Sequence, residues 1–283
     1  MYNEKFLVIG GDKRQKLIAE SLTSKRFDVH KCALDNKKSN ISKLIANSTV
    51  LILPIPCQKD EFTLNAPYHD EDITLEQIYT NINSGHKVFG GVIKQNFLDV
   101  LRGRGAAVYD YNNDEALTIF NAAFTAEGAI KIAIENSERT IWKSDSLVLG
   151  FGRIGKLLTP IISALGSRIT VCARKAYDRA FVEAYGYDCC DFSQLPDKLY
   201  EFDYIFNTVP SLIMNNELLN YCKQNVCIID LASKPGGVDF KYAKSKGIKA
   251  IEALSLPGKI SPEMAAGFIE KSILNILKKE VYE

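Results

Sequence analysis

The stretch LVLGFGRIGKLL, residues 147–158, joins an apolar strand pattern to an apolar helical pattern through three glycines. Gly150, Gly152 and Gly155 have the spacing GxGxxG, directly after the predicted strand and directly before the predicted helix. In that context the first glycine permits a tight turn, the second lets a pyrophosphate approach the backbone, and the third lets the helix pack on the strand. The free N–H groups of the helix start would face the phosphates. The stretch therefore predicts a dinucleotide site; a purely structural turn is the alternative.

The next strand indicates which dinucleotide. Sites for NAD usually place an acidic residue at its tip, about 20 positions on, to bind the ribose 2′-hydroxyl. Here RITVCARK, residues 168–175, ends in Ala173, Arg174 and Lys175 without an acid. An arginine there can bind a 2′-phosphate through charge-assisted hydrogen bonds. We therefore expect NADP, with NAD still open; two basic residues on a solvated loop are the alternative.

Two later apolar runs end in small and polar residues, FNTVPSLIM (206–214) and IIDLASKPGGVDF (228–240). Ligands of open parallel sheets bind at the carboxyl ends of the strands. The residues expected near the nicotinamide are Asn207, Thr208, Pro210, Asp230, Ala232, Ser233 and the turn 235–237. Ordinary turn chemistry is the alternative for each of them. The segment SLPGKISP, residues 255–262, is expected to be a third such loop, lining a cleft between two domains.

The start of the chain repeats the strand, turn and helix pattern in KFLVIGGDKRQKLIAESLTSKRFDVHKC, residues 5–32, with a second strand near 27–31. A Gly10–Gly11 turn before a helix, with Arg14 in its first turn, suits a small carboxylate. A second dinucleotide site is disfavoured because a third glycine is missing. Asp12 is expected to cap the helix.

Alternating strand and helix patterns predict an α/β protein with two doubly wound parallel-sheet (Rossmann-like) domains and a cleft between them. We expect a substrate-side domain over residues 1–120, completed by a C-terminal helix within 262–283. We expect an NAD(P)-binding domain with a linker helix over residues 121–261. The strands expected in the second domain are 147–149, 169–172, 204–207, 227–231 and 250–253, and the helices named are 155–165, 214–221 and, at the C-terminus, 262–279.

Composition narrows the class of protein. Lys and Arg number 35 against 34 Asp and Glu, so neither nucleic acid nor an anionic membrane surface is an expected partner. The seven cysteines form no CxxC pair, which suggests reduced thiols in a cytoplasm and no metal site. We find no pattern of a signal peptide and no apolar stretch near the ~18 residues that a membrane span needs.

Histidines lie only at positions 30, 69 and 86, so the expected cofactor domain has none. Oxidation of a hydroxy acid uses a base beside the nicotinamide, commonly a histidine. Oxidation of an unsaturated ring is less demanding because aromatisation supplies driving force. The pattern therefore favours redox chemistry at C=C or C=N bonds over a 2-hydroxyacid dehydrogenase.

Several segments together resemble the family of the dipicolinate synthase A subunit: VIGGDKRQ, LPIP, TAEGAIKIAI, VLGFGRIGKLL, NTVPSLIMN, DLASKPGGVDFKYAKSKGIKA and LPGKISPEMAAGFI. The resemblance spans nearly the whole chain, and DLASKPGGVDFKYA with GGDKRQ is more specific than the glycine fingerprint. It implies an NAD(P)-dependent oxidoreductase that converts dihydrodipicolinate to dipicolinate, pyridine-2,6-dicarboxylate. It also implies a flavoprotein-like partner, the dipicolinate synthase B subunit, in the mother-cell cytoplasm of a sporulating bacterium; a homo-oligomer stays open.

The resemblance also assigns residues to each half of the site. It implies a substrate half of Gly10, Gly11, Asp12, Arg14 and Gln15, and a cofactor half of Gly150, Gly152, Arg153, Ile154, Arg174, Thr208, Pro210 and Asp230. A dicarboxylate needs a second anion anchor, for which the candidates are Ser233, Lys234 and Lys259. Glu127 and Asp230 are the candidate proton acceptors. Two other functions stay open: a nucleotide-binding regulatory protein without catalysis, and a dehydrogenase of another small acid.

Overall fold

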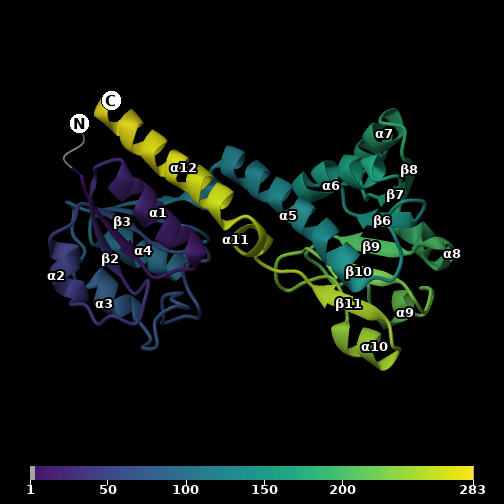
Figure 1. The fold of residues 1–283 in the computed structure, drawn as a ribbon, viewed down its shortest axis with the longest axis horizontal. Helices are drawn as coiled ribbons and strands as arrows, with labels where there is room; N and C mark the ends of the chain where they lie inside the picture. Colours follow the sequence, from purple (N-terminus) through teal and green to yellow (C-terminus); the bar gives the residue numbers. More distant parts are fainter. Residues whose placement is uncertain (1–3, 283) are drawn as a thin grey trace. The chain divides into compact units, whose positions relative to one another are not determined.

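The computed structural model describes residues 4–282, which fold as two compact units (Figure 1). Unit 1 comprises the described residues of Met1–Phe120 and Ser261–Glu283, and unit 2 is Asn121–Ile260. Each unit contains one parallel sheet with helices on both faces. The predicted class, two doubly wound parallel α/β sheets, is confirmed.

Unit 1 has a five-stranded sheet in the order β2-β1-β3-β4-β5. Its strands are β1 (Lys5–Ile9), β2 (Asp28–Cys32), β3 (Val50–Ile52), β4 (Lys87–Gly90) and β5 (Ala107–Asp110). Side chains alternate along β1, so that Phe6 and Val8 enter one core while Leu7 enters the other. The remaining elements are α1 (Lys13–Ser24), α2 (Ile41–Ala46), α3 (Leu75–Tyr79), α4 (Gln95–Gly103), η1 (Tyr111–Asn113) and α12 (Pro262–Tyr282).

The helix α12 packs on α1, so that the C-terminal segment completes unit 1. Glu270, only 3% exposed, holds the two helices together. Its carboxylate accepts hydrogen bonds from the Ser21 hydroxyl and the Lys25 ammonium, each at 2.7 Å. Because removing either partner would leave a buried carboxylate uncompensated, the contact between the two helices depends on Ser21 and Lys25.

Unit 2 has a six-stranded sheet in the order β11-β10-β9-β6-β7-β8. Its strands are β6 (Asp145–Leu149), β7 (Arg168–Cys172), β8 (Asp188–Cys190), β9 (Tyr204–Asn207), β10 (Cys227–Asp230) and β11 (Lys249–Glu252). The order changes direction at β6, the strand that leads into the glycine turn, and ligands of such sheets bind at this switch point. The helical elements are α5 (Glu115–Asn136), α6 (Arg153–Ala164), α7 (Ala176–Ala184), η2 (Phe192–Gln194), α8 (Leu195–Lys198), η3 (Leu199–Glu201), α9 (Asn216–Leu219), α10 (Phe240–Ser245) and α11 (Leu256–Ile260).

The helix α5 begins in unit 1 and continues in unit 2 from Asn121. Contrary to the sequence expectation, its 22 residues are long enough to cross a membrane and include an 18-residue window with a mean hydropathy of 1.3. Half of that window is buried, and Ala126, Ala129 and Ala133 belong to a core cluster of unit 2. Packing inside the fold therefore accounts for the apolar surface of this helix.

Three local expectations differ from the structure. The segment 255–262, predicted as a loop, contains the helix α11, whose second residue is Pro257; proline suits a helix start because its missing N–H has no partner there anyway. The short strand β8 was not predicted. The helix expected over 214–221 is confined to α9, because Met214 pairs instead with Val238 in an isolated bridge.

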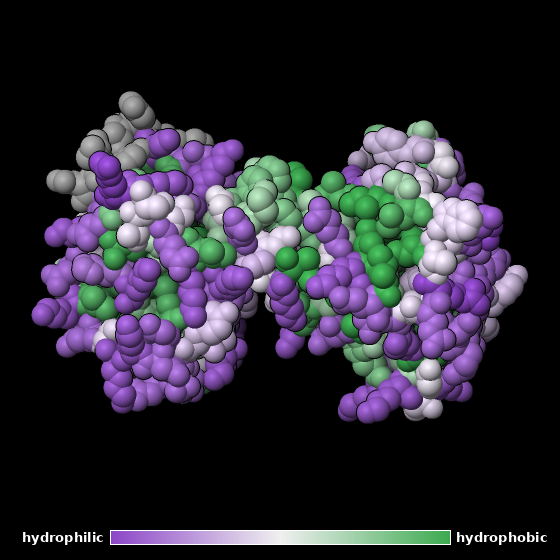
Figure 2. Space-filling view, viewed as in Figure 1, coloured by the Kyte–Doolittle hydropathy of each residue, from purple (hydrophilic) through white to green (hydrophobic). Residues whose placement is uncertain are grey.

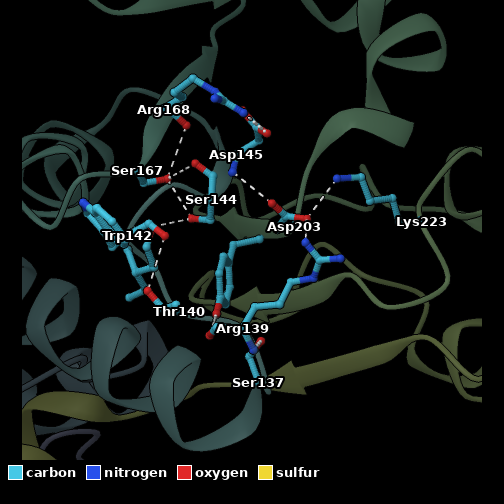
Figure 3. A network of polar contacts seen from close by, with 12 residues as sticks. Ser137, Arg139, Thr140, Trp142, Ser144, Asp145, Ser167, Arg168, Asp203 and Lys223 are labelled. Atoms are coloured by element: carbon cyan, nitrogen blue, oxygen red, sulfur yellow. Dashed lines mark hydrogen bonds and ion pairs between the residues drawn. The ribbon is translucent and has the colours of Figure 1, made fainter.

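A polar network ties the amino ends of the unit 2 strands together (Figure 3). Asp203, whose side chain is 5% exposed, pairs with Lys223 at 2.9 Å and Arg139 at 3.0 Å and accepts a hydrogen bond from the Asp145 amide. Burial by itself would raise the pKa of the Asp203 carboxyl. Lys223, the Asp145 amide and Arg139 lower this pKa by more than burial raises it, so it lies below its usual value. Asp145 in turn pairs with Arg168 at 2.6 Å. The network lies at the opposite end of β6 from the glycine turn, so its role is structural.

Candidate nucleotide-binding site

The glycine turn, residues 150–155, joins β6 to α6. Gly150 has φ +95°, a conformation that favours glycine, and its N–H donates to the Cys172 carbonyl at 2.8 Å. The Thr208 hydroxyl donates to the Leu149 carbonyl at 2.8 Å, just before the turn. The turn is therefore fixed from β7 on one side and from the end of β9 on the other.

The other two glycines are required for different reasons. A Cβ at Gly155 would lie 2.2 Å from the Gly150 carbonyl oxygen, so only glycine lets the helix lie this close to the turn. A Cβ at Gly152 would meet nothing within 4 Å, because this residue, the N-cap of α6, faces open space. A turn that only shapes the backbone does not require glycine at this position. Binding of a phosphate at the helix start does require glycine, because a side chain here would block its approach.

A pocket of about 680 Å³ lies in front of this turn. Its walls include Gly150 and Gly152 of the turn, Arg174 and Lys175 after β7, and, after β9, Val209, Ser211 and Ile213. Arg179 fixes the β7 tip by donating from Nη1 to the carbonyls of Ala173 at 2.8 Å and Arg174 at 2.9 Å. Both basic side chains of the tip are exposed to the pocket. One acid, Asp178 on α7, also lines it, so the wall is cationic overall among the described residues.

The loops after β9 and β10 are held together by a buried polar cluster. Asn207 donates from Nδ2 to Asp230 Oδ1 at 2.8 Å, and neither side chain is more than 1% exposed. The Asp230 carboxylate also accepts from the N–H groups of Ala232 at 3.1 Å and Gly237 at 2.8 Å. A Cβ at Gly237 would lie 2.1 Å from Asn207 Nδ2, so glycine is required there. Asn207 and Asp230 thus shape the loops, and proton transfer by Asp230 stays a prediction.

The other residues predicted for this edge are more exposed. Thr208 is half-buried, whereas Pro210, Ser233 and Lys234 are exposed. Arg153 is exposed at the start of α6, while Ile154 packs against the core of unit 2 and does not line the pocket. The loop residues Ser233 and Lys234 are therefore accessible to a ligand at the carboxyl edge of this sheet.

The anion site at the Gly10–Gly11 turn stays a prediction, but the groups proposed for it have partners within the protein. The N–H groups of these glycines donate to the carbonyls of Cys32 and Asn65, at 2.9 and 2.8 Å. Asp12 caps α1 as predicted, and Arg14, 4% exposed, pairs with it through Nη2 at 2.8 Å and Nε at 3.0 Å. Arg14 Nη2 also donates to the Ile55 carbonyl at 2.6 Å. In this conformation the arginine organises the turn, and its charge is balanced by Asp12.

The remaining candidates are surface or buried groups. Glu127 is exposed on α5 and Lys259 is exposed on α11. Gln15 is fully buried with its Oε1 accepting from the Asp12 amide, in a capping box.

The seven cysteines are free thiols. Burial raises the pKa of Cys32 to about 11 and is the main cause that raises the pKa of Cys57 to about 12. Both thiols are therefore poor nucleophiles. Across residues 4–278, His, Cys, Asp and Glu side chains form no group of three suited to a metal.

Sequence reasoning missed several residues of the pocket wall: Phe151, Lys156, Tyr177, Asp178, Phe192, Val209, Ser211 and Ile213. Two of these carried a usable signal. Phe151 occupies the variable position between two glycines of the fingerprint, and Lys156 directly follows the last one. The others reach the wall from separate elements, so only tertiary structure brings them together.

Known proteins resemble this chain over nearly its full length. Residues 5–112 match the family model described as the N-terminal domain of the dipicolinate synthase A subunit. The dipicolinate synthase A subunit of Bacillus subtilis (strain 168) is 32% identical, over 98% of this chain and 96% of that protein. The crystal structure of the A subunit from Bacillus halodurans superposes with a TM-score of 0.87 at 28% identity, covering 96% of this chain and 97% of that one.

Enzymes outside the family share the fold alone. The apo structure of D-lactate dehydrogenase from Escherichia coli has a TM-score of 0.65 at 15% identity, covering 99% of this chain and 98% of that one. The two units therefore define a two-domain, Rossmann-type fold of the dehydrogenase kind. Within that class, the chain belongs to the family of the dipicolinate synthase A subunit.

Proposed function

We propose that the chain is an oxidoreductase subunit that converts dihydrodipicolinate to dipicolinate, pyridine-2,6-dicarboxylate, with NADP as the hydride acceptor. The observation that carries the proposal is the open space in front of Gly152, at the start of α6. This space would admit the pyrophosphate of a dinucleotide. The reaction is proposed because the family is named for dipicolinate synthesis.

The residues of unit 2 fit a nicotinamide dinucleotide. Gly150, Gly152 and the start of α6 would hold the pyrophosphate, and Arg174 with Lys175 would bind a 2′-phosphate. This basic tip is the reason for proposing NADP before NAD. Phe192, Val209 and Ile213 provide the apolar wall against which an adenine ring could lie.

The nicotinamide, when bound, supplies a hydride acceptor. The dihydropyridine ring loses one hydride and one proton, giving dipicolinate, NADPH and H⁺. Unit 2 has no histidine, and a ring that becomes aromatic needs less help from a strong base than a hydroxy acid does. Glu127 and Asp230 are the proposed proton acceptors. The exposure of Glu127 favours it over Asp230, whose carboxylate is occupied by N–H donors.

The substrate carries two carboxylates, which require donors or cations. Ser233 and Lys234 are exposed on the loop after β10, and Lys259 is exposed on α11. We propose these three as carboxylate anchors, since an exposed ammonium is free to pair with an anion. Arg14 is not among them, because Asp12 already neutralises it.

Membership of a family of enzyme subunits implies a partner, and we propose the flavoprotein-like B subunit of dipicolinate synthase. The proposed location is the mother-cell cytoplasm of a sporulating bacterium. Association of the chain with further copies of itself is compatible with these assignments.

The test uses the purified chain, alone and mixed with the B subunit. Freshly generated dihydrodipicolinate is supplied with NADP or with NAD, and dipicolinate absorbance and nicotinamide reduction are followed together. Stoichiometric appearance of both products, faster with NADP, is the expected result.

Two outcomes would overturn the proposal. Dipicolinate formed without nicotinamide reduction would assign the redox step to the partner. NADPH binding without product in either mixture would leave a non-catalytic nucleotide-binding protein, the alternative that the burial of Asp230 favours.

A further inference from the structure

A second pocket, of about 320 Å³, lies between α6 and α7 of unit 2. Five of its eight lining residues are aromatic: Phe151, Tyr177, Phe181, Tyr185 and Tyr187. Apolar residues also gather on the surface of unit 2 in the region of α6 (Figure 2). Contiguous exposed apolar patches mark ligand-binding or interaction sites.

The aromatic wall is built by the regular spacing of α7. Tyr177 and Phe181 lie on α7 and Tyr185 is its C-cap, so these residues, spaced four apart, share one face. Their ring centroids lie 5.2 and 6.2 Å apart, and the side chains remain 58%, 44% and 64% exposed. The rings of Tyr177 and Phe181 are inclined at 82° and those of Phe181 and Tyr185 at 37°, so they form an angled apolar wall. A planar ligand can stack on the open face of one ring and meet the edge of another.

The charge of the wall defines the ligand further. Of the eight lining residues only Lys156 is charged, and none is acidic. Its Nζ lies 5.5 Å from the centroid of the Phe151 ring, at the side of the pocket nearest the glycine turn. Three phenol hydroxyls add hydrogen-bond donors. The wall therefore suits a planar anion, and the volume suits a single ring.

The second pocket adjoins the nucleotide pocket. Phe151, Lys156 and Tyr177 line both of them. An anion paired with Lys156 would remove that cation from the nucleotide phosphates and would occupy space beside them. Ligands of the two pockets should therefore weaken each other's binding, and by the same factor.

We infer that the pocket between α6 and α7 binds a small aromatic carboxylate, with its ring against the α7 aromatics and its carboxylate on Lys156, in competition with the nucleotide. The choice of ligand rests on the proposed function, because dipicolinate is a molecule of this class. The site would then let accumulating product reduce cofactor binding.

The experiment titrates pyridine-2,6-dicarboxylate into the full-length chain by calorimetry in metal-free buffer, with and without NADPH. Tyr185→Ser should weaken binding about tenfold, since it removes one stacking surface. Tyr185→Phe should retain it. Lys156→Gln should weaken the binding of both ligands. Tyr200→Ser is the matched control, since Tyr200 is 61% exposed and lies outside both pockets, and it should change nothing.

Saturating NADPH should raise the dissociation constant of the dicarboxylate for the unaltered chain. Equal affinity in Tyr185→Ser and the unaltered chain would overturn the inference, because the ligand would then bind elsewhere, such as at the reaction site. Equally tight binding of cyclohexane-1,3-dicarboxylate would also overturn it, since no ring stacking would be involved. Binding needs no turnover, so the variant pattern can hold even if the chain fails to oxidise dihydrodipicolinate.

Discussion

Replacing Gly152 by alanine should strongly weaken nucleotide binding with little loss of stability, whereas the same change at Gly155 should weaken binding and also destabilise unit 2. The distinction comes from the space that each new methyl group would occupy. At Gly152 it would meet no protein atom within 4 Å, and φ is −81°, which alanine adopts readily. At Gly155 it would lie 2.2 Å from the Gly150 carbonyl oxygen, so the backbone must move.

The magnitudes follow from these contacts. Gly152→Ala should cost about 1 kcal/mol of unfolding free energy, because alanine is a poorer N-cap residue than glycine but its methyl group meets no protein atom. Its methyl group would keep a pyrophosphate from two backbone N–H groups, and charge-assisted hydrogen bonds contribute about 1.5–3 kcal/mol each. The loss of NADPH affinity should then be roughly 10² to 10⁴-fold. Gly155→Ala should cost about 3 kcal/mol of stability because it overpacks a close contact.

Two measurements separate the variants: thermal unfolding without ligand, and fluorescence titration with NADPH. The midpoint of Gly152→Ala should fall by no more than about 4 °C for a chain of this size, and that of Gly155→Ala by roughly 6–12 °C. If Gly152→Ala bound NADPH within threefold of the unaltered chain, the phosphate would not lie at this turn. If Gly152→Ala unfolded at as low a temperature as Gly155→Ala, a methyl group at position 152 would not lie in open space, and that part of the reasoning would be wrong.

Other changes test the surroundings of the site. Arg174→Gln should weaken NADPH about tenfold and NADH less than twofold, since only the former carries a 2′-phosphate, and equal weakening in paired titrations would contradict this. Asp230→Asn should lower the unfolding free energy by about 2 kcal/mol in urea, because it replaces an acceptor of N–H groups from the end of β9 and from the loop after β10, and an unchanged midpoint would refute that role. Asp203→Asn should destabilise the chain at neutral pH by about 1–3 kcal/mol, since Lys223 and Arg139 lose their charged partner. Because the pKa of Asp203 is lowered on folding, its stabilisation is complete above the unfolded value near about 3.9 and is lost as the pH falls through the lower folded value. The difference in unfolding free energy between Asp203→Asn and the unaltered chain, measured at several pH values, should therefore shrink below about pH 4. A difference that stayed constant there would contradict the stabilising role of the Asp203 carboxylate.

Local chemistry by itself determined the fold class and the glycine turn. Strand patterns followed by Gly10–Gly11 and by Gly150–Gly152 predict two α/β units, because hydrophobic periodicity and the conformational freedom of glycine act within a few residues. The cap at Asp12 could be predicted for the same reason. The short helix α11 could not, because the proline and glycine of its sequence suit a turn equally well.

Tertiary structure decided which polar groups are available. Arg14, Asn207 and Asp230 look functional in the sequence, yet the fold gives each of them partners inside the protein, from segments up to 41 residues away. Conversely, the aromatic residues of α7 line a pocket that no local pattern marks as a site. A sequence shows which side chains can bind a ligand; burial and long-range hydrogen bonds decide which of them remain accessible to one.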